Sequence, residues 1–212
     1  MKTYWVKTAR FIKSLLSGFV WDMPGKGKTV YLTFDDGPVP EITSWVLSTL
    51  KEHNIKATFF CIGDNIRKHP EVFRQVIEAG HTIGNHTFNH LNGWQNDYQY
   101  YIENFEKCEQ VIAQHIPQPA KLFRPPYGKI KSAQAKAIRK KGYKIIMWDV
   151  LSADFDHTIT PQKCLNNVIN NVAPGSIIIF HDSIKASANV KYALPGAIAH
   201  LKNEGYTFGV LA

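Results

Sequence analysis

Strand-like and helix-like segments alternate along this chain from residue 28 onward, and this alternation most constrains how it can fold. Seven short segments rich in β-branched and aromatic residues are typical of strands, at 28–32, 57–63, 81–84, 121–123, 143–150, 176–180 and 206–211. Segments with helical spacing of apolar residues separate most of them, at 41–53, 70–78, 97–115, 132–141, 161–172 and 195–203. Because parallel strands need crossover helices, the pattern predicts an α/β fold whose parallel sheet is either a barrel or open and doubly wound.

The composition limits the classes of function that the chain can have. Its 212 residues, of which 44% are hydrophobic, suffice for one full core. The formal net charge of +8 favours anionic partners. However, the basic residues are spread over helix faces without an arginine-rich run, so we expect no nucleic-acid partner. No glycine-rich phosphate loop follows the first strand, which counts against nucleotide binding.

The first 27 residues are expected to form an N-terminal helix and connector, ahead of a catalytic domain at 28–212. Apolar residues recur every four positions within 1–21 and are accompanied by four basic residues, which indicates an amphipathic helix that packs on the domain. Weak contact with a membrane surface is the alternative. The uncharged stretch 14–21 is too short to span a membrane, and no signal-peptide cleavage site follows it. A cytoplasmic or peripherally membrane-associated location is therefore favoured.

Two adjacent carboxylates, Asp35 and Asp36, follow the first strand and precede Gly37 and Pro38, which end it. Two carboxylates this close repel each other unless a cation compensates their charge. One of them could bind a divalent metal while the other acts as a base. The same four residues are also a common composition for a surface turn.

A histidine pair, His86 and His90, follows the third strand. Histidines four residues apart lie on one face of a helical turn, which is a suitable spacing for holding one metal ion. With Asp36 they make a set of two histidines and one carboxylate that leaves positions for water and substrate. Chance pairs at this spacing also occur.

The segment from Arg124 to Gly128 contains two prolines that fix the backbone and lack amide donors. The nearest available N–H group is that of Tyr127, and a rigid backbone donor is what an oxyanion requires. Arg124 could hold Asp35 ionised through a forked pair. A proline turn with a surface arginine is the alternative.

The ends of the fifth and sixth strands carry further candidates. His181 emerges from an apolar run and is suited to act as a general acid near neutral pH. Trp148, Asp154 and Phe155 could line a groove the size of a sugar, although Trp148 could equally belong to the core. Since the chemistry-bearing residues all follow strands, they are expected at the carboxyl end of one sheet, where such folds bind their ligands.

These motifs together resemble those of the polysaccharide deacetylases, the NodB-homology or carbohydrate esterase 4 family. The resemblance extends from about Val30 to Leu211 and rests on four segments: Thr33-Phe34-Asp35-Asp36-Gly37-Pro38, His86-x-x-x-His90, Arg124-x-Pro126-Tyr127-Gly128 and Ile178-x-x-His181. It implies a distorted seven-stranded (β/α) barrel of the NodB-homology type. It also implies removal of acetyl groups from N-acetylated, or sometimes O-acetylated, glycans such as peptidoglycan or chitin.

The resemblance also implies a role for each matching residue. Asp35 would be the base, His181 the acid, Arg124 the partner of the base and Tyr127 the oxyanion donor, with Pro126 beside it in the substrate site. Asp36, His86 and His90 would bind one divalent metal, zinc first and other transition metals also. An acetylated glycan is the expected partner, and the chain is expected to be a monomer.

One position departs from the family pattern. Leu151 stands where the family usually has the acid that partners the catalytic histidine. Asp149, Asp154 or Asp182 could supply that carboxylate instead. If none does, His181 is expected to work as an acid without a carboxylate partner, with altered activity or an unusual substrate. A catalytically impaired sugar-binding protein on the same fold is the alternative function.

Overall fold

The computed structural model describes residues 4–23, 25 and 27–212. Its strands form one parallel sheet in the order β5-β4-β3-β2-β1-β7-β6, and β8 pairs with β1 outside this path. The strands are β1 (Thr29–Asp35), β2 (Thr58–Cys61), β3 (Thr82–Asn85), β4 (Leu122–Phe123), β5 (Lys144–Ile145), β6 (Val150–Leu151), β7 (Ile177–His181) and β8 (Thr207–Gly209). The sheet curls into an incomplete barrel, since β5 and β6 do not pair with each other.

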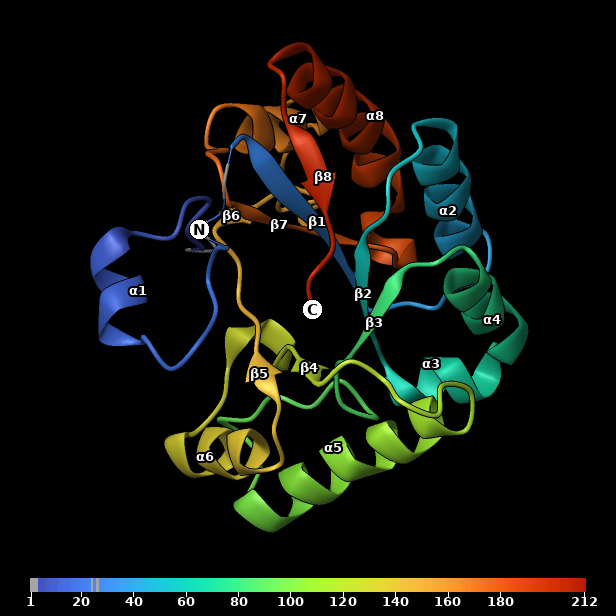
Figure 1. Ribbon diagram of the computed structural model, residues 1–212, viewed down its shortest axis with the longest axis vertical. Coiled ribbons are helices and arrows are strands. Elements are labelled where there is room, and N and C mark those ends of the chain that lie inside the picture. Colours follow the sequence, from blue (N-terminus) through green and yellow to red (C-terminus); the bar gives the residue numbers. More distant parts are fainter. Residues whose placement is uncertain (1–3, 24, 26) are drawn as a thin grey trace.

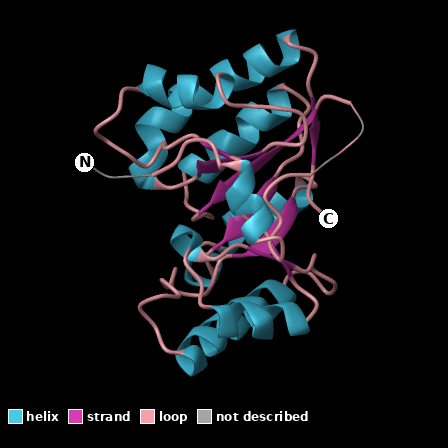
Figure 2. Ribbon diagram, turned by 90° about the vertical axis from the view of Figure 1, so that its left-hand side faces the viewer, coloured by secondary structure: helices cyan, strands magenta, loops and turns pink. Residues whose placement is uncertain are grey.

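Helices surround the strands in Figure 1 and lie above and below them in Figure 2. They are α1 (Arg10–Leu15), α2 (Ile42–Glu52), α3 (Gly63–Lys68), α4 (Pro70–Glu78), α5 (Tyr98–Ala113), α6 (Ser132–Lys140), α7 (Pro161–Ile169) and α8 (Ser187–Asn203). Two short 3-10 turns, Pro126–Gly128 and Ile184–Ala186, follow β4 and β7. Each crossover thus returns the chain to the same end of the sheet, which brings the residues after the strands together.

Strand β1 lies at the centre of the sheet, between β2 and β7. Val30, Leu32 and Phe34 of β1 are completely buried between the sheet and the helices, and the ring of Phe34 stacks on Phe59 of β2 at 5.0 Å and on Phe180 of β7 at 6.2 Å. In this register Asp35 lies opposite His181 across the β1–β7 pair. The central core therefore sets the relative position of the two residues expected to be the base and the acid.

Two predicted elements differ from those observed. The strand expected at 143–150 is interrupted, because residues 146–149 leave the sheet between β5 and β6. The last helix begins at Ser187 and not at Pro195, which lies inside it. Proline removes one helical hydrogen bond, but the buried face of α8 packs against α7, and this packing outweighs that loss.

Within residues 4–23 the N-terminal segment forms one helix of six residues, α1, so the helix predicted within 1–21 is present but short. Isolated bridges join the segment to the barrel, Lys7 to Val150, Val20 to Ile146 and Asp22 to Ser176. In Figure 1 this segment lies beside the chain that connects β5 to β6. Among the described residues, no helix combines the length and apolar character needed to cross a membrane.

Candidate active site

The end of β1 holds the two carboxylates in different surroundings. Asp35 is 2% exposed, and its Oδ1 accepts a hydrogen bond of 2.6 Å from Arg124. Asp36 has a φ of 82°, a left-handed conformation that is uncommon outside glycine. Asn65 donates to the Asp36 carbonyl at 2.7 Å and helps to hold this conformation. The strand thus ends in a turn that lets both carboxylates face one pocket.

Gly37 is required immediately after this turn. Its N–H donates to Asp182 Oδ1 at 3.0 Å, and a Cβ atom at this position would lie 2.0 Å from Asp182 Oδ2. The Thr43 hydroxyl donates to that second oxygen at 2.6 Å. Asp182 is therefore occupied in holding the turn.

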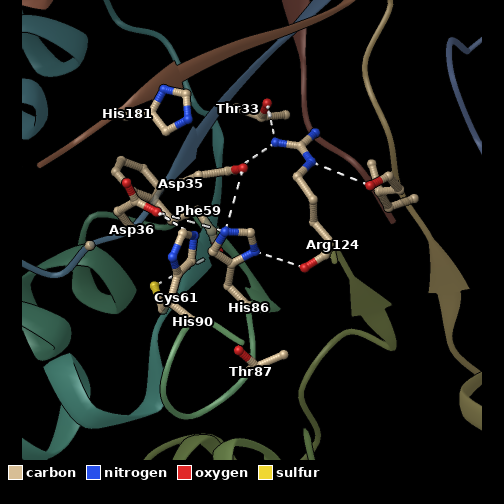
Figure 3. A network of polar contacts seen from close by, with 12 residues as sticks. Thr33, Asp35, Asp36, Phe59, Cys61, His86, Thr87, His90, Arg124 and His181 are labelled. Atoms are coloured by element: carbon tan, nitrogen blue, oxygen red, sulfur yellow. Dashed lines mark hydrogen bonds and ion pairs between the residues drawn. The ribbon is translucent and has the colours of Figure 1, made fainter. Parts of the chain in front are cut away.

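Three potential metal ligands, Asp36, His86 and His90, have ligand atoms that all lie within 4.8 Å of one another. Asp36 Oδ1 lies 3.2 Å from His90 Nε2 and 3.7 Å from His86 Nε2 (Figure 3). This oxygen is buried, and no described residue donates a hydrogen bond to it. A buried carboxylate oxygen without a donor, facing two imidazole nitrogens, fits a bound cation.

The state of the two histidines also fits a metal site. Burial, the largest influence on each, lowers the pKa of both His86 and His90, which favours the neutral imidazoles that bind metals. His86 Nδ1 lies 2.7 Å from the Arg124 carbonyl oxygen. A proton on Nδ1 would be donated to that carbonyl, leaving the Nε2 lone pair directed at Asp36.

The histidines do not share a helical turn, so this part of the prediction is wrong. They lie in the loop after β3, in which Thr87 and His90 have φ values of 64° and 55°. Asn104 on α5 holds the loop, because its Oδ1 accepts from the backbone N–H groups of Phe88 and Asn89 at 2.8 and 2.9 Å. Loop conformation, not helical periodicity, brings the two rings to a centroid separation of 5.0 Å.

Arg124 is completely buried and shares its donors among four acceptors. Nη1 donates to Asp35 Oδ1 and to Thr33 Oγ1, at 2.6 and 2.8 Å. Nε and Nη2 donate to the carbonyl oxygens of Ile146 and Met147, at 3.3 and 3.0 Å. The expected ion pair with Asp35 is therefore present, but it is single and not forked.

His181 has a carboxylate partner, and it is Asp154. His181 Nδ1 lies 2.7 Å from Asp154 Oδ1, and the His181 backbone N–H donates to Oδ2, also at 2.7 Å. Burial lowers the pKa of His181, but the charge and hydrogen bond of Asp154, with further contributions from Asp36 and Asp35, raise it to about 9. The imidazole is consequently protonated at neutral pH, as a general acid must be.

Asp154 was also predicted to line the sugar groove, and the structure contradicts this, because its side chain is completely buried behind His181. Asp149, the remaining alternative partner for the histidine, is instead bound to Lys7 and Lys13. Leu151 lies in an apolar cluster with Ala153 and Ile179. The departure from the family pattern is thus offset by a carboxylate three residues further along the chain.

The predicted base, acid and metal ligands line one pocket of about 730 Å³, together with Tyr127, Trp148 and Phe155. Tyr127 has a φ of 60°, and its exposed ring lies 4.6 Å from that of His90. Pro126, also predicted for this site, is buried in the turn and does not line the pocket. Leu151, noted above for its departure from the family pattern, also lines the pocket, and sequence reasoning missed four further lining residues: Tyr4, Lys129, Ile179 and Lys185.

The chain is similar in sequence to known proteins. The sequence model of the family described as "Polysaccharide deacetylase" matches residues 22–146. A peptidoglycan-N-acetylglucosamine deacetylase of Bacillus cereus is 34% identical over 197 residues, which cover 91% of this chain and 70% of that protein.

Two solved structures show the same fold. A peptidoglycan N-acetylglucosamine deacetylase in complex with 4-naphthalen-1-yl-N-oxidanyl-benzamide superposes with a TM-score of 0.89 at 33% identity, covering 96% of this chain and 95% of that one. A pseudoenzyme of carbohydrate esterase family 4 from Bacillus anthracis has a TM-score of 0.81 at 26% identity, covering 90% of this chain and 66% of that one. The expected distorted barrel is therefore confirmed, and the chain belongs to the polysaccharide deacetylase family.

Proposed function

We propose that this chain is a metal-dependent hydrolase that removes acetyl groups from an N-acetylated glycan. The observation that carries the proposal is that the pocket joins an Asp-His-His ligand set to two further pairs, Asp35 with Arg124 and His181 with Asp154. A ligand set, a base held by a cation and an acid held by a carboxylate are the parts that amide hydrolysis requires.

Asp36, His86 and His90 would hold one divalent ion. Two imidazoles and one carboxylate are a ligand set that zinc binds in catalytic sites, and other transition metals accept it also. When bound, the metal would supply a Lewis acid that polarises the acetyl carbonyl and makes water more acidic.

The other residues act on protons and charge. Asp35, oriented by Arg124, takes a proton from the attacking water. The backbone N–H of Tyr127 donates a hydrogen bond to the oxyanion that forms on the acetyl carbon. His181 then gives its proton to the leaving nitrogen, so that the C–N bond breaks into acetate and an amine. A pKa of about 9 keeps His181 protonated for this step at neutral pH.

The pocket walls suit a sugar. Tyr4, Trp148 and Phe155 present aromatic surface to the pocket, and such surface binds the apolar faces of sugar rings. The Bacillus cereus relative is a peptidoglycan-N-acetylglucosamine deacetylase, and another relative is a chitooligosaccharide deacetylase, so peptidoglycan fragments and chitin oligosaccharides are the first substrates to test.

A sugar-binding protein without activity was the alternative, and Leu151 was its main support. The Asp154–His181 contact removes that support, since the histidine is partnered without an acid at position 151. The intact Asp35–Arg124 pair also favours an enzyme.

Acetate release tests the proposal. The protein is incubated with peptidoglycan fragments and with chitin oligosaccharides, after treatment with a chelator and again after addition of zinc or another divalent metal. We expect release from at least one glycan, abolished by the chelator and restored by the metal. The absence of release from every acetylated glycan, at full metal occupancy, would contradict the proposed function.

A further inference from the structure

The backbone between β5 and β6 depends on the N-terminal segment for support. Met147 N–H donates to the Val20 carbonyl at 2.7 Å, and Leu151 N–H donates to the Val6 carbonyl at 2.8 Å. Thr8 adds two bonds, from its N–H to the Asp149 carbonyl at 2.9 Å and from its hydroxyl to the Trp148 carbonyl at 2.8 Å. We call residues 146–151 the connecting strip. At the gap in the barrel, the N-terminal segment lies beside this strip (Figure 1).

A buried ionic cluster fixes the two segments to each other. The side chain of Asp149 is 3% exposed and binds Lys7 Nζ at 2.5 Å and Lys13 Nζ at 2.5 Å. Ser176 donates to the same carboxylate at 2.5 Å, and Lys13 also pairs with Asp22. Both lysines come from the N-terminal segment, so removal of their charges would leave Asp149 buried without a cation.

The connecting strip in turn holds the partner of the base. The carbonyl oxygens of Ile146 and Met147 accept hydrogen bonds from Arg124, whose Nη1 binds Asp35. A planar guanidinium held at several donors cannot turn without losing some of these contacts. Displacement of the connecting strip would therefore displace Arg124 relative to Asp35.

The same N-terminal segment reaches the acid side of the pocket. Tyr4 lines the pocket, its hydroxyl donates to Asp156 Oδ2 at 2.9 Å, and its ring meets the Phe155 ring at a centroid distance of 5.8 Å. Phe155 in turn packs edge-on against His181 at 5.1 Å.

We propose that residues 4–23 are a positioning element of the active site, which holds the connecting strip so that Arg124 orients Asp35. Lys7, Lys13 and Thr8 are the positioning residues on this path. The proposal rests on the proposed function, in which Asp35 is the base. It assigns a role in turnover to a segment that lies outside every motif shared with the family.

The main test is the double variant Lys7→Met with Lys13→Met, compared with a Lys7→Arg and Lys13→Arg counterpart that keeps both charges. Lys141→Met is the matched control, because it breaks a 2.5 Å lysine–glutamate pair with Glu106 that lies outside the pocket. For each protein we would measure kcat and KM on penta-N-acetylchitopentaose, bound zinc and the melting temperature. Assays would run well below the lowest melting temperature.

We expect the methionine double variant to lose about tenfold or more in kcat, with KM and bound zinc close to the parent values, because small misplacements of catalytic groups are costly. The arginine counterpart should recover most of kcat, and the control should match the parent. A folded double variant with parental kcat would overturn the proposal. If the double variant does not fold, Thr8→Val is tested in its place, because it removes one hydrogen bond with little change in side-chain shape. A parental kcat in Thr8→Val would also overturn the proposal.

A measurement that does not depend on turnover separates this proposal from the proposed function. The buried Arg124 Nε–H, bonded to Ile146, can be followed by NMR hydrogen exchange on arginine-labelled protein. We expect exchange to be faster in the methionine double variant and unchanged in Lys141→Met. Unchanged exchange in the double variant would overturn the positioning role, whereas accelerated exchange in a protein inactive on all glycans would contradict only the proposed function.

Discussion

Replacement of Asp154 by asparagine should remove activity in a strongly pH-dependent way. Burial lowers the pKa of His181, but Asp154, with smaller contributions from Asp36 and Asp35, raises it from an ordinary 6.5 to about 9. At about 1.4 kcal/mol per pH unit, this difference corresponds to about 3 kcal/mol of preference for the charged imidazolium. If the pKa of His181 returns to 6.5, its protonated fraction at pH 8 falls from about 0.9 to about 0.03.

The expected result for Asp154→Asn is therefore a loss of about thirtyfold in kcat at pH 8 and a much smaller loss at pH 6. The assay is acetate release at saturating substrate between pH 5 and 10. The alkaline limb should lie near pH 9 in the parent and about two pH units lower in the variant. Asp64→Asn, which removes a carboxylate paired with Lys68 outside the pocket, is the control.

The pH dependence of the free energy of unfolding tests the same prediction in a second way. Because the pKa of His181 is raised in the folded protein, its contribution to the free energy of unfolding is complete below pH 6.5 and is lost as the pH rises through about 9. The stability difference between parent and Asp154→Asn should therefore shrink over this interval. Coincident alkaline limbs in parent and variant would refute the reasoning that Asp154 sets the proton affinity of the acid.

Three further predictions concern the metal, the base and the substrate. His86→Ala or His90→Ala should lower bound metal from about one ion per chain to near zero, as measured by elemental analysis, and full occupancy in both variants would place the metal elsewhere. Asp35→Asn should keep the fold and much of the metal, but its kcat should fall about hundredfold or more, because an amide cannot accept the proton of water. Near-parental acetate release by this variant would show that another group is the base. Lys129 and Lys185 line the pocket, and no acidic side chain of the described residues pairs with either of them. The double variant Lys129→Gln with Lys185→Gln should therefore raise KM several-fold for a carboxylate-bearing glycan and little for neutral chitin oligosaccharides. Equal changes of KM for the two kinds of glycan would show that these lysines do not select between them.

Much of the candidate site could be predicted because it depends on sheet topology. Parallel strands with crossover helices place the residues that follow each strand at one edge, so Asp35, His86, Arg124 and His181 were expected to meet, and they do. Composition and alternation alone left a barrel and an open sheet both possible. The motif resemblance was needed to choose between them.

Features that depend on where the chain leaves regular structure could not be predicted. The left-handed residues Thr87 and His90 bring the histidines together without a helix. The contact of Asp154 with His181 depends on the path of the chain after β6, which a list of nearby carboxylates does not reveal. Tyr4 enters the pocket from the N-terminal segment, where no motif indicated a functional residue.

In the proposed function, Asp36, His86 and His90 bind one metal ion that acetate release requires. The most direct test is to titrate metal-free protein with zinc and to measure bound metal and acetate release from an N-acetylated glycan in the same samples. We predict that activity rises in proportion to bound zinc and levels off at about one ion per chain. Full activity in the metal-free protein, or activity that does not follow bound metal, would show that acetate release does not depend on a metal at this site.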